Sequence, residues 1–215
     1  VQGRGLVSSV GLSAPAACAA MRTKLTNPTE TRFWSKAGHW LMAHQVPLER
    51  PWRGLDKLVR MASMAIEESL EGVPPQTWAE IPLLLCVAER ERPGRIDGLN
   101  DALLPRIQDL LGHRFAPSSA VVPHGRASLP VALAAARKLL AQPGCTRVVV
   151  AGVDTLLHWP TLDVHDRAER LLTEQTSNGF MPGEAAGALR LGPPQAEPAL
   201  CITGILRGSG APCTM

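Results

Sequence analysis

Consecutive apolar residues alternate along the chain with stretches in which apolar residues recur every three or four positions. Continuous apolar runs occupy Ile81–Ala88, Ala120–Val122 and Arg147–Val153, and such runs are typical of strands that are covered on both faces. Helical periodicity occupies Leu55–Leu70, and Gly72 with the following prolines ends that helix. The alternation predicts a layered α/β fold with a mixed sheet.

The same reasoning assigns the remaining segments of a single domain over residues 1–215. We expect a first strand that ends at a glycine turn, helices after it, and two more strands near the end; these are Gly3–Gly11, Ala14–Lys24, Leu99–Leu111, Thr161–Leu172, Ala188–Leu191 and Ala199–Arg207. The stretch Thr26–Arg53 holds three prolines, and its tryptophans and phenylalanine lie among polar residues, so we expect a long irregular excursion. Loops of this length are usually functional or mobile, which indicates a binding or interface loop.

The segment Ser118–Leu140 carries the chemistry of interest. A short strand, Ala120–Val122, is followed by a tight turn and an alanine-rich helix over Pro130–Leu140, with Pro130 in its first turn. Backbone N–H groups point out of such a helix end and its dipole favours negative charge. The turn is therefore a natural seat for a nucleophile or an oxyanion, although an ordinary strand–helix unit has the same pattern. The small alanine side chains predict that this helix is buried by close packing on both faces.

Composition narrows the classes of function. The chain has 215 residues, 45% hydrophobic and 19% charged, with a net charge of +3, which suits a globular domain. Basic residues form no run that indicates nucleic-acid binding, and no apolar stretch has the length of a membrane span. Five cysteines form no C-x-x-C pair, so we expect free thiols, no metal site and a cytoplasmic protein. The Gly3-x-Gly5 pair has too short a strand before it for a dinucleotide loop, and we expect no cofactor.

Three stretches together resemble the amino-terminal half of a β-ketoacyl-acyl-carrier-protein synthase, of the thiolase superfamily. The opening VQGRGLVSSVGLSAPAACAAMRTKL is similar to the family's first strand, turn and helix. The strand, elbow and helix that lead to RVVVAGVDTLL are similar to the family's central segment. The third stretch, SNGFMPGEAAGALRL, resembles the family's D-G-F-x-x-G-E-G-A-G motif. The resemblance covers essentially the whole chain and implies one half of a thiolase-like α/β/α sandwich.

The resemblance also implies an activity and a site. Family members carry an acyl group as a thioester on a cysteine at the start of the central helix, and condense it with malonyl on acyl carrier protein. In this chain the elbow reads His124-Gly125-Arg126-Ala127-Ser128 and has no cysteine. Two alignments place the nucleophile position at Gly125 or at Arg126, and neither residue accepts an acyl group. Ser128 is an alternative nucleophile, and His124 is either a site residue or a polar loop residue.

Other residues of the third stretch have a structural and a functional interpretation. Gly179 and Gly183, like Gly187, are expected where backbones approach closely. Glu184 could be catalytic, and the interpretation that we favour is that it holds backbone N–H groups of a turn in this loop. Phe180 and Met181 are expected either to line an acyl pocket or to pack in the core. Asp154, at the end of its strand, could contact a ligand or cap a turn.

Two functions from different classes follow. The first hypothesis is a degenerate synthase-like protein that serves as a non-catalytic partner subunit or binding scaffold, in which Arg126 holds an anionic group. The alternative is a 3-oxoacyl-acyl-carrier-protein synthase, an acyltransferase of fatty acid biosynthesis, with an altered nucleophile or with its assisting residues in a second half outside this chain. The resemblance implies a homodimer through Ser118–Val122 or a partner subunit. It also implies acyl carrier protein or an acyl thioester as ligand, and no nucleic acid or membrane.

Overall fold

The computed structural model describes residues 1–193 and 200–204, and its centre is a five-stranded mixed sheet. The strands run in the order β1 (Gly3–Val7), β7 (Glu184–Leu191), β6 (Val148–Thr155), β4 (Leu83–Cys86) and β5 (Ala120–Val122). β4 pairs parallel with β5 and β6, whereas β7 pairs antiparallel with β6 and β1. The mixed sheet expected from the sequence is confirmed.

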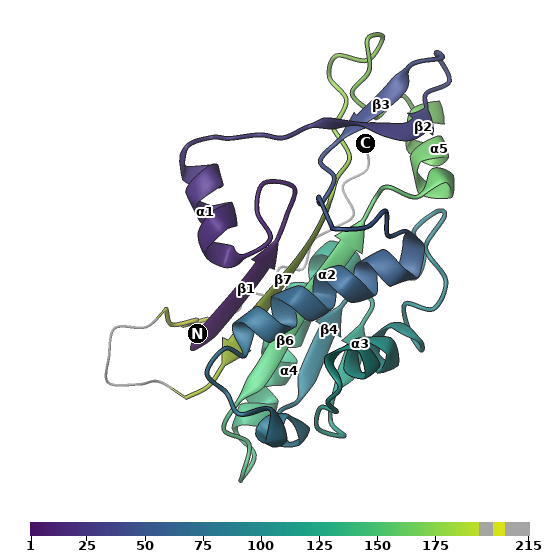
Figure 1. Ribbon diagram of the computed structural model, residues 1–215. Coiled ribbons are helices and arrows are strands. Elements are labelled where there is room, and N and C mark those ends of the chain that lie inside the picture. The colour runs from purple at the N-terminus through teal and green to yellow at the C-terminus, as the bar shows by residue number, and fades with distance from the viewer. Residues whose placement is uncertain (194–199, 205–215) are drawn as a thin grey trace.

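Helices cover the sheet on both faces (Figure 1). α2 (Gly54–Ser69) and α3 (Leu103–Leu111) contribute to one core, whereas α4 (Ser128–Leu140) packs behind β6 and β4. α1 (Ala14–Arg22) lies beside β1, and α5 (Trp159–Arg167) follows β6. The layers are those of the predicted α/β/α sandwich.

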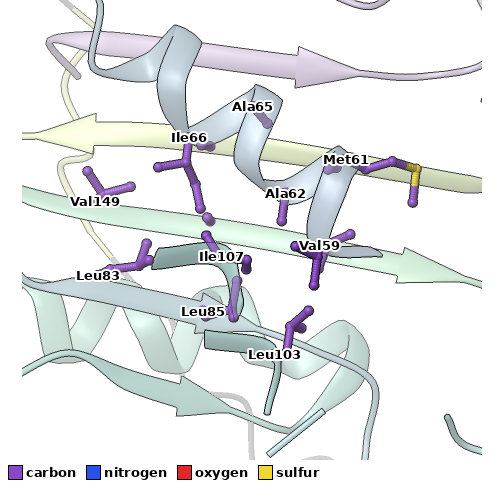
Figure 2. Packing of buried hydrophobic residues seen from close by; sticks show 14 of the residues in the cluster. Val59, Met61, Ala62, Ala65, Ile66, Leu83, Leu85, Leu103, Ile107 and Val149 are labelled. Carbon is purple, nitrogen blue, oxygen red and sulfur yellow. The ribbon is translucent and has the colours of Figure 1, made fainter. Parts of the chain in front are cut away.

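The side chains of strand β4 belong to two hydrophobic cores, one on each face of the sheet. Leu83 and Leu85 face α2, where they meet Ile66 and other aliphatic side chains (Figure 2). Leu84 and Cys86 face α4. A run without polar positions is needed because successive side chains of a strand point to opposite faces and both faces are covered.

The helix α2 lies directly on the backbone of β1. A Cβ added to Gly5 would be 1.9 Å from the Ala65 carbonyl oxygen, and one added to Gly3 would be 2.2 Å from the Ser69 carbonyl oxygen. Only glycine permits this approach. Glu68 adds a second tie, because its carboxylate accepts the N–H of Leu6 at 2.9 Å and that of Ala14 at 2.7 Å.

The segment Thr26–Arg53 is not irregular throughout, and that prediction was wrong in part. It contains a hairpin of β2 (Thr29–Trp34) and β3 (Trp40–Ala43), in which Trp34 and Trp40 pair across the strands with ring centroids 4.3 Å apart. Alternating β-branched and aromatic residues in TETRFW carry this strand signal.

Several boundaries also differ from the expectations. α4 begins at Ser128 rather than at Pro130, and it is buried on one face only, through Ser128, Ala132 and Ala136. β7 begins at Glu184, so this residue lies in a strand and not in the expected loop. Of the expected strand Ala199–Arg207, residues 200–204 form neither strand nor helix, and the remainder lies outside the described residues.

Candidate functional site

The elbow between β5 and α4 lies at the carboxyl ends of the three parallel strands. β5 ends at Val122, a 3-10 turn spans Gly125–Ala127, and α4 begins at Ser128. The Gly125 N–H donates to the Val87 carbonyl oxygen, just beyond β4, at 3.0 Å. This bond fixes the turn against the neighbouring strand, at the edge where open α/β sheets bind ligands.

Ser128 is a buried structural hydroxyl. Ser128 is only 1% exposed to solvent. The Oγ accepts the N–H of His124 at 2.9 Å and lies 2.8 Å from the Val122 carbonyl oxygen, to which it donates. These bonds close the turn, because they join the end of β5 to the first residue of α4.

His124 and Arg126 are both exposed, on either side of Gly125. Among the described residues, no hydrogen bond or ion pair involves the side chain of either one. The Arg126 charge nevertheless acts on the nearby Glu89 carboxylate. The residues predicted around the elbow therefore lie together, with one buried hydroxyl and one exposed cation.

An ion cluster beside the elbow was missed by the sequence analysis. Arg92 donates to both carboxylate oxygens of Glu89, with Nε 3.1 Å from Oε1 and Nη2 2.9 Å from Oε2. Its Nη1 donates to Asp154 Oδ1 at 2.6 Å. Asp154 thus pairs with a cation across two strand ends, and its Oδ1 also accepts the Thr155 N–H at 2.8 Å. The signal was present, because Glu89 and Asp154 follow or end adjacent parallel strands, whose carboxyl ends meet.

The cluster is electrostatically complementary. The hydrogen bond from Arg92 holds the pKa of Glu89 below its ordinary value, although partial burial opposes this. Burial acts against the charge of Arg92, but its bonds to Asp154 and Glu89 outweigh burial and raise its pKa. Glu89 and Arg92 are therefore both charged at neutral pH.

Two adjoining hollows lie on the α4 face of the sheet. One, of about 290 Å³, reaches the elbow at Gly125 and Ser128. The other, of about 400 Å³, extends between α1 and α4 over β1 and β7. Both are lined by Leu6, Cys86 and Leu129, and their lining is almost wholly apolar. Leu129 is 47% exposed, so α4 leaves this part of the sheet uncovered.

Glu184 lies at the same end of the sheet, in a second cluster. Its buried carboxylate pairs with Lys57 of α2, accepts the Val46 N–H at 2.9 Å and accepts the Thr155 hydroxyl at 3.0 Å. It thereby joins the excursion, α2 and β6. Lys57 was missed because the sequence does not show what packs over it.

The glycines, Phe180 and Met181 of the third stretch lie in different parts of the structure. A Cβ on Gly179 would be 2.3 Å from the Leu171 carbonyl carbon, which only glycine permits. A Cβ on Gly187 would lie 3.7 Å from the Gly5 carbonyl oxygen, an ordinary contact distance, so the close approach expected there is absent. Phe180 packs against the small core of Leu41, Leu162 and Leu171. Met181 instead lines a hollow of about 340 Å³ beneath the hairpin. Gly179, Phe180 and Met181 do not line the elbow hollow, whereas Gly187 does.

The thiols of the described residues, Cys18, Cys86, Cys145 and Cys201, are free; Cys213 lies outside these residues. Burial raises the pKa of Cys86 to about 11, so this thiol is neutral and unreactive near pH 7. Within the described chain no three His, Cys, Asp or Glu side chains gather as metal ligands. Of the helices described, none is both long and apolar enough to cross a bilayer.

Comparison with solved structures places this fold. The chain is similar to the ketosynthase from module 6 of the bacillaene synthase of Bacillus subtilis 168, with a TM-score of 0.64 and 17% identity over 89% of this chain and 38% of that one. It is similar to AntDE:AntF, a type II PKS acyl-carrier protein in complex with its ketosynthase, with a TM-score of 0.67 and 14% identity over 89% and 57%. It is also similar to the ishigamide ketosynthase/chain length factor, with a TM-score of 0.65 and 16% identity over 93% of this chain and 62% of that one.

These likenesses show the fold, and they fit the amino-terminal half of the ketosynthase architecture. The chain spans only 38% to 62% of the length of those three structures. No protein-family model matches the chain, and no curated protein sequence matches it.

Proposed function

We propose that this chain is a degenerate ketosynthase-like protein that acts as a non-catalytic partner subunit or binding scaffold. One observation carries the proposal: the elbow between β5 and α4 offers no group that can accept an acyl chain. Gly125 has no side chain, and Arg126 has no nucleophilic lone pair at neutral pH. A thioester intermediate needs a thiolate, and a helix N-terminus helps only if a thiol is there.

The environment of Ser128 supports the same conclusion against a serine nucleophile. A nucleophilic hydroxyl needs a base within hydrogen-bond reach and a face open to substrate. Ser128 is 1% exposed, and its Oγ is engaged by the His124 N–H and the Val122 carbonyl. Its proton is directed to backbone oxygens, which cannot act as a general base.

The apolar hollows support a role in assembly. Their shared lining, with Leu129 at 47% exposure, is the kind of surface that marks an interaction site. Among the similar structures, one is a ketosynthase in complex with an acyl carrier protein and one is a ketosynthase/chain length factor. We infer that this chain assembles with a second thiolase-type half or subunit, with acyl carrier protein or an acyl thioester as ligand. Free thiols fit a reducing compartment such as the cytoplasm.

The edge strand β5 provides the contact that we assign to self-association. β5 is at the end of the sheet and pairs only with β4 among the described strands. The Val122 carbonyl accepts the Val87 N–H from the β4 side, so the polar groups of Val121 point to the open edge. An apolar edge of this kind pairs readily with its own copy around a two-fold axis.

Light scattering tests the partner role. We expect wild-type protein at tens of micromolar to have the mass of two chains. Val121→Pro removes an outward N–H at an edge that tolerates proline, and should give the mass of one chain with an unchanged circular dichroism spectrum. Leu110→Ser, at an exposed leucine of α3 that lines neither hollow, is the matched control and should remain dimeric. A wild-type mass of one chain throughout would overturn self-association through β5.

A further inference from the structure

The side-chain space at the elbow is already filled. Gly125 has a φ of +53°, and a Cβ built on it would lie 2.1 Å from Glu89 Oε2 and 3.0 Å from Glu89 Cδ. Real Cβ atoms do not approach oxygen so closely, so the Glu89 carboxylate occupies the position that any side chain at residue 125 would need. The Gly125 N–H bond to the Val87 carbonyl oxygen prevents the turn from moving aside.

Glu89 cannot rotate away without cost, because both of its oxygens are held. Arg92 donates to Oε1 and Oε2 in a bidentate pair, at 3.1 and 2.9 Å, the geometry that makes Arg–carboxylate pairs strong and directional. Arg92 is itself fixed by Asp154 Oδ1 at 2.6 Å, and its side chain is only 11% exposed. Arg92, in the turn after β4, and Asp154, near the end of β6, therefore hold the Glu89 carboxylate over the glycine.

We propose that Glu89 is an internal ligand of the elbow: its carboxylate, positioned by Arg92 and Asp154, closes the position at residue 125 to any side chain. Glu89 contacts the elbow directly, whereas Arg92 and Asp154 act through it as positioning residues. The inference deepens the proposed non-catalytic function and rests on it for its meaning. It adds a structural rule, that a carboxylate at 89 and a side chain at 125 exclude each other.

A double-mutant cycle tests the rule, with a control that the chain itself offers. Gly54 has a φ of +52°, almost that of Gly125, but nothing lies within 4 Å of its Cβ position. Gly54→Ala therefore measures left-handed strain alone, and should lower Tm by about 2–4 °C in a chain of this size. Gly125→Ala adds the collision with Glu89 and should lower Tm at least twice as far. In a Glu89→Ala background, the further loss from Gly125→Ala should fall to that of Gly54→Ala.

Arg92→Met provides the test of positioning. Without its bidentate partner the Glu89 carboxylate can rotate, so the extra loss from Gly125→Ala should shrink although Glu89 is still present. A merely structural Arg92 would lower Tm by itself and leave that extra loss unchanged. The Gly54→Ala loss should be the same in all three backgrounds.

Clear outcomes oppose the inference. Equal Tm losses for Gly125→Ala and Gly54→Ala, or a Gly125→Ala loss that Glu89→Ala does not reduce, would overturn it. If Gly125→Ala does not fold, folding of the Glu89→Ala/Gly125→Ala double variant supports the rule, and its failure to fold contradicts it. A one-chain mass in light scattering would instead count against the proposed assembly, and would leave the cycle intact.

Discussion

The two faces of the central sheet differ in how completely this chain covers them. On the α2 face, large aliphatic residues such as Leu85 of β4 and Ile66 of α2 are fully buried between the sheet and its helices (Figure 2). On the α4 face, the buried cluster is smaller and relies on residues such as Ala132 and Ala136. Beside it, the two apolar hollows remain open, and Leu129 is 47% exposed.

The difference shows which face of the sheet this chain covers by itself and which face it leaves partly open. The α2 face has its own helices, its own charge ties through Glu68 and Glu184, and direct helix-to-backbone packing at Gly5. The α4 face is one helix over part of a sheet. The elbow opens on this less covered face, so the elbow and the apolar hollows share one surface.

Neighbouring leucines of β4 provide the sharpest stability comparison. Leu85→Ala, on the α2 face, should lower the free energy of unfolding by about 3–5 kcal/mol, because the rigid core cannot collapse around the cavity. Leu84→Ala, on the α4 face, should cost less, about 2 kcal/mol, because α4 can settle on the vacated space. Urea denaturation measures both. Equal costs would show that the two faces are equally rigid.

The buried carboxylate of Glu184 tests the charge ties of the covered face. Glu184→Gln leaves Lys57 without its partner, and Lys57 is only 15% exposed, so we expect a loss of about 2–4 kcal/mol. Glu174→Gln is the control, because the Glu174 side chain is 74% exposed in its contact with His39 and should cost less than about 0.5 kcal/mol. Similar losses in urea denaturation would argue against a tie at Glu184.

The thiol of Cys86, on the α4 face, predicts a pH dependence. Its pKa is raised by burial from 9.0 to about 11. Above pH 9 the unfolded chain loses this proton more readily than the folded one, so stability falls as pH rises, by about 1 kcal/mol at pH 10. Cys86→Ala should remove this part of the decline and Cys145→Ala should not. Identical pH profiles for the two variants would contradict the assignment.

Leu129 should give the smallest effect on stability. Because it is half exposed, Leu129→Ser should change the free energy of unfolding by less than about 0.5 kcal/mol. The same change should lower the fluorescence of a bound hydrophobic dye, since it removes apolar lining from both hollows. A large stability loss would mean that this face is already packed within the chain.

The fold was predictable from sequence because its strands are short apolar runs and α2 has a clear stripe. Leu83–Cys86 and Val148–Val153 are apolar at every position or nearly so, and only a strand between two layers uses such a run. The elbow could also be placed, since a strand, a turn and an alanine-rich helix follow one another. The hairpin at Thr29–Ala43 was missed because its polar residues, and the prolines before and after it, resembled a loop.

The charged part of the site was not predictable in the same way. Glu89 and Arg92 lie in a stretch that is rich in charges and reads as a solvated turn. Their function depends on Asp154, which is 62 residues from Arg92 in sequence. Pairings of this kind arise from tertiary packing, which periodicity does not encode. The position of the Glu89 carboxylate also depends on residue 125 being a glycine, because any side chain there would occupy the same space.

Intact mass after exposure to an acyl-carrier thioester tests most directly whether the elbow accepts an acyl group. We predict no acyl adduct on wild-type protein, because the elbow has no thiol, Ser128 is buried and bonded, and each of the chain's cysteines lies on another segment. Ser128→Ala serves as the matched variant, and its spectrum should likewise show only the mass of that variant without an acyl group. An adduct that maps to Ser128 and disappears in Ser128→Ala would contradict the non-catalytic proposal and favour an acyltransferase.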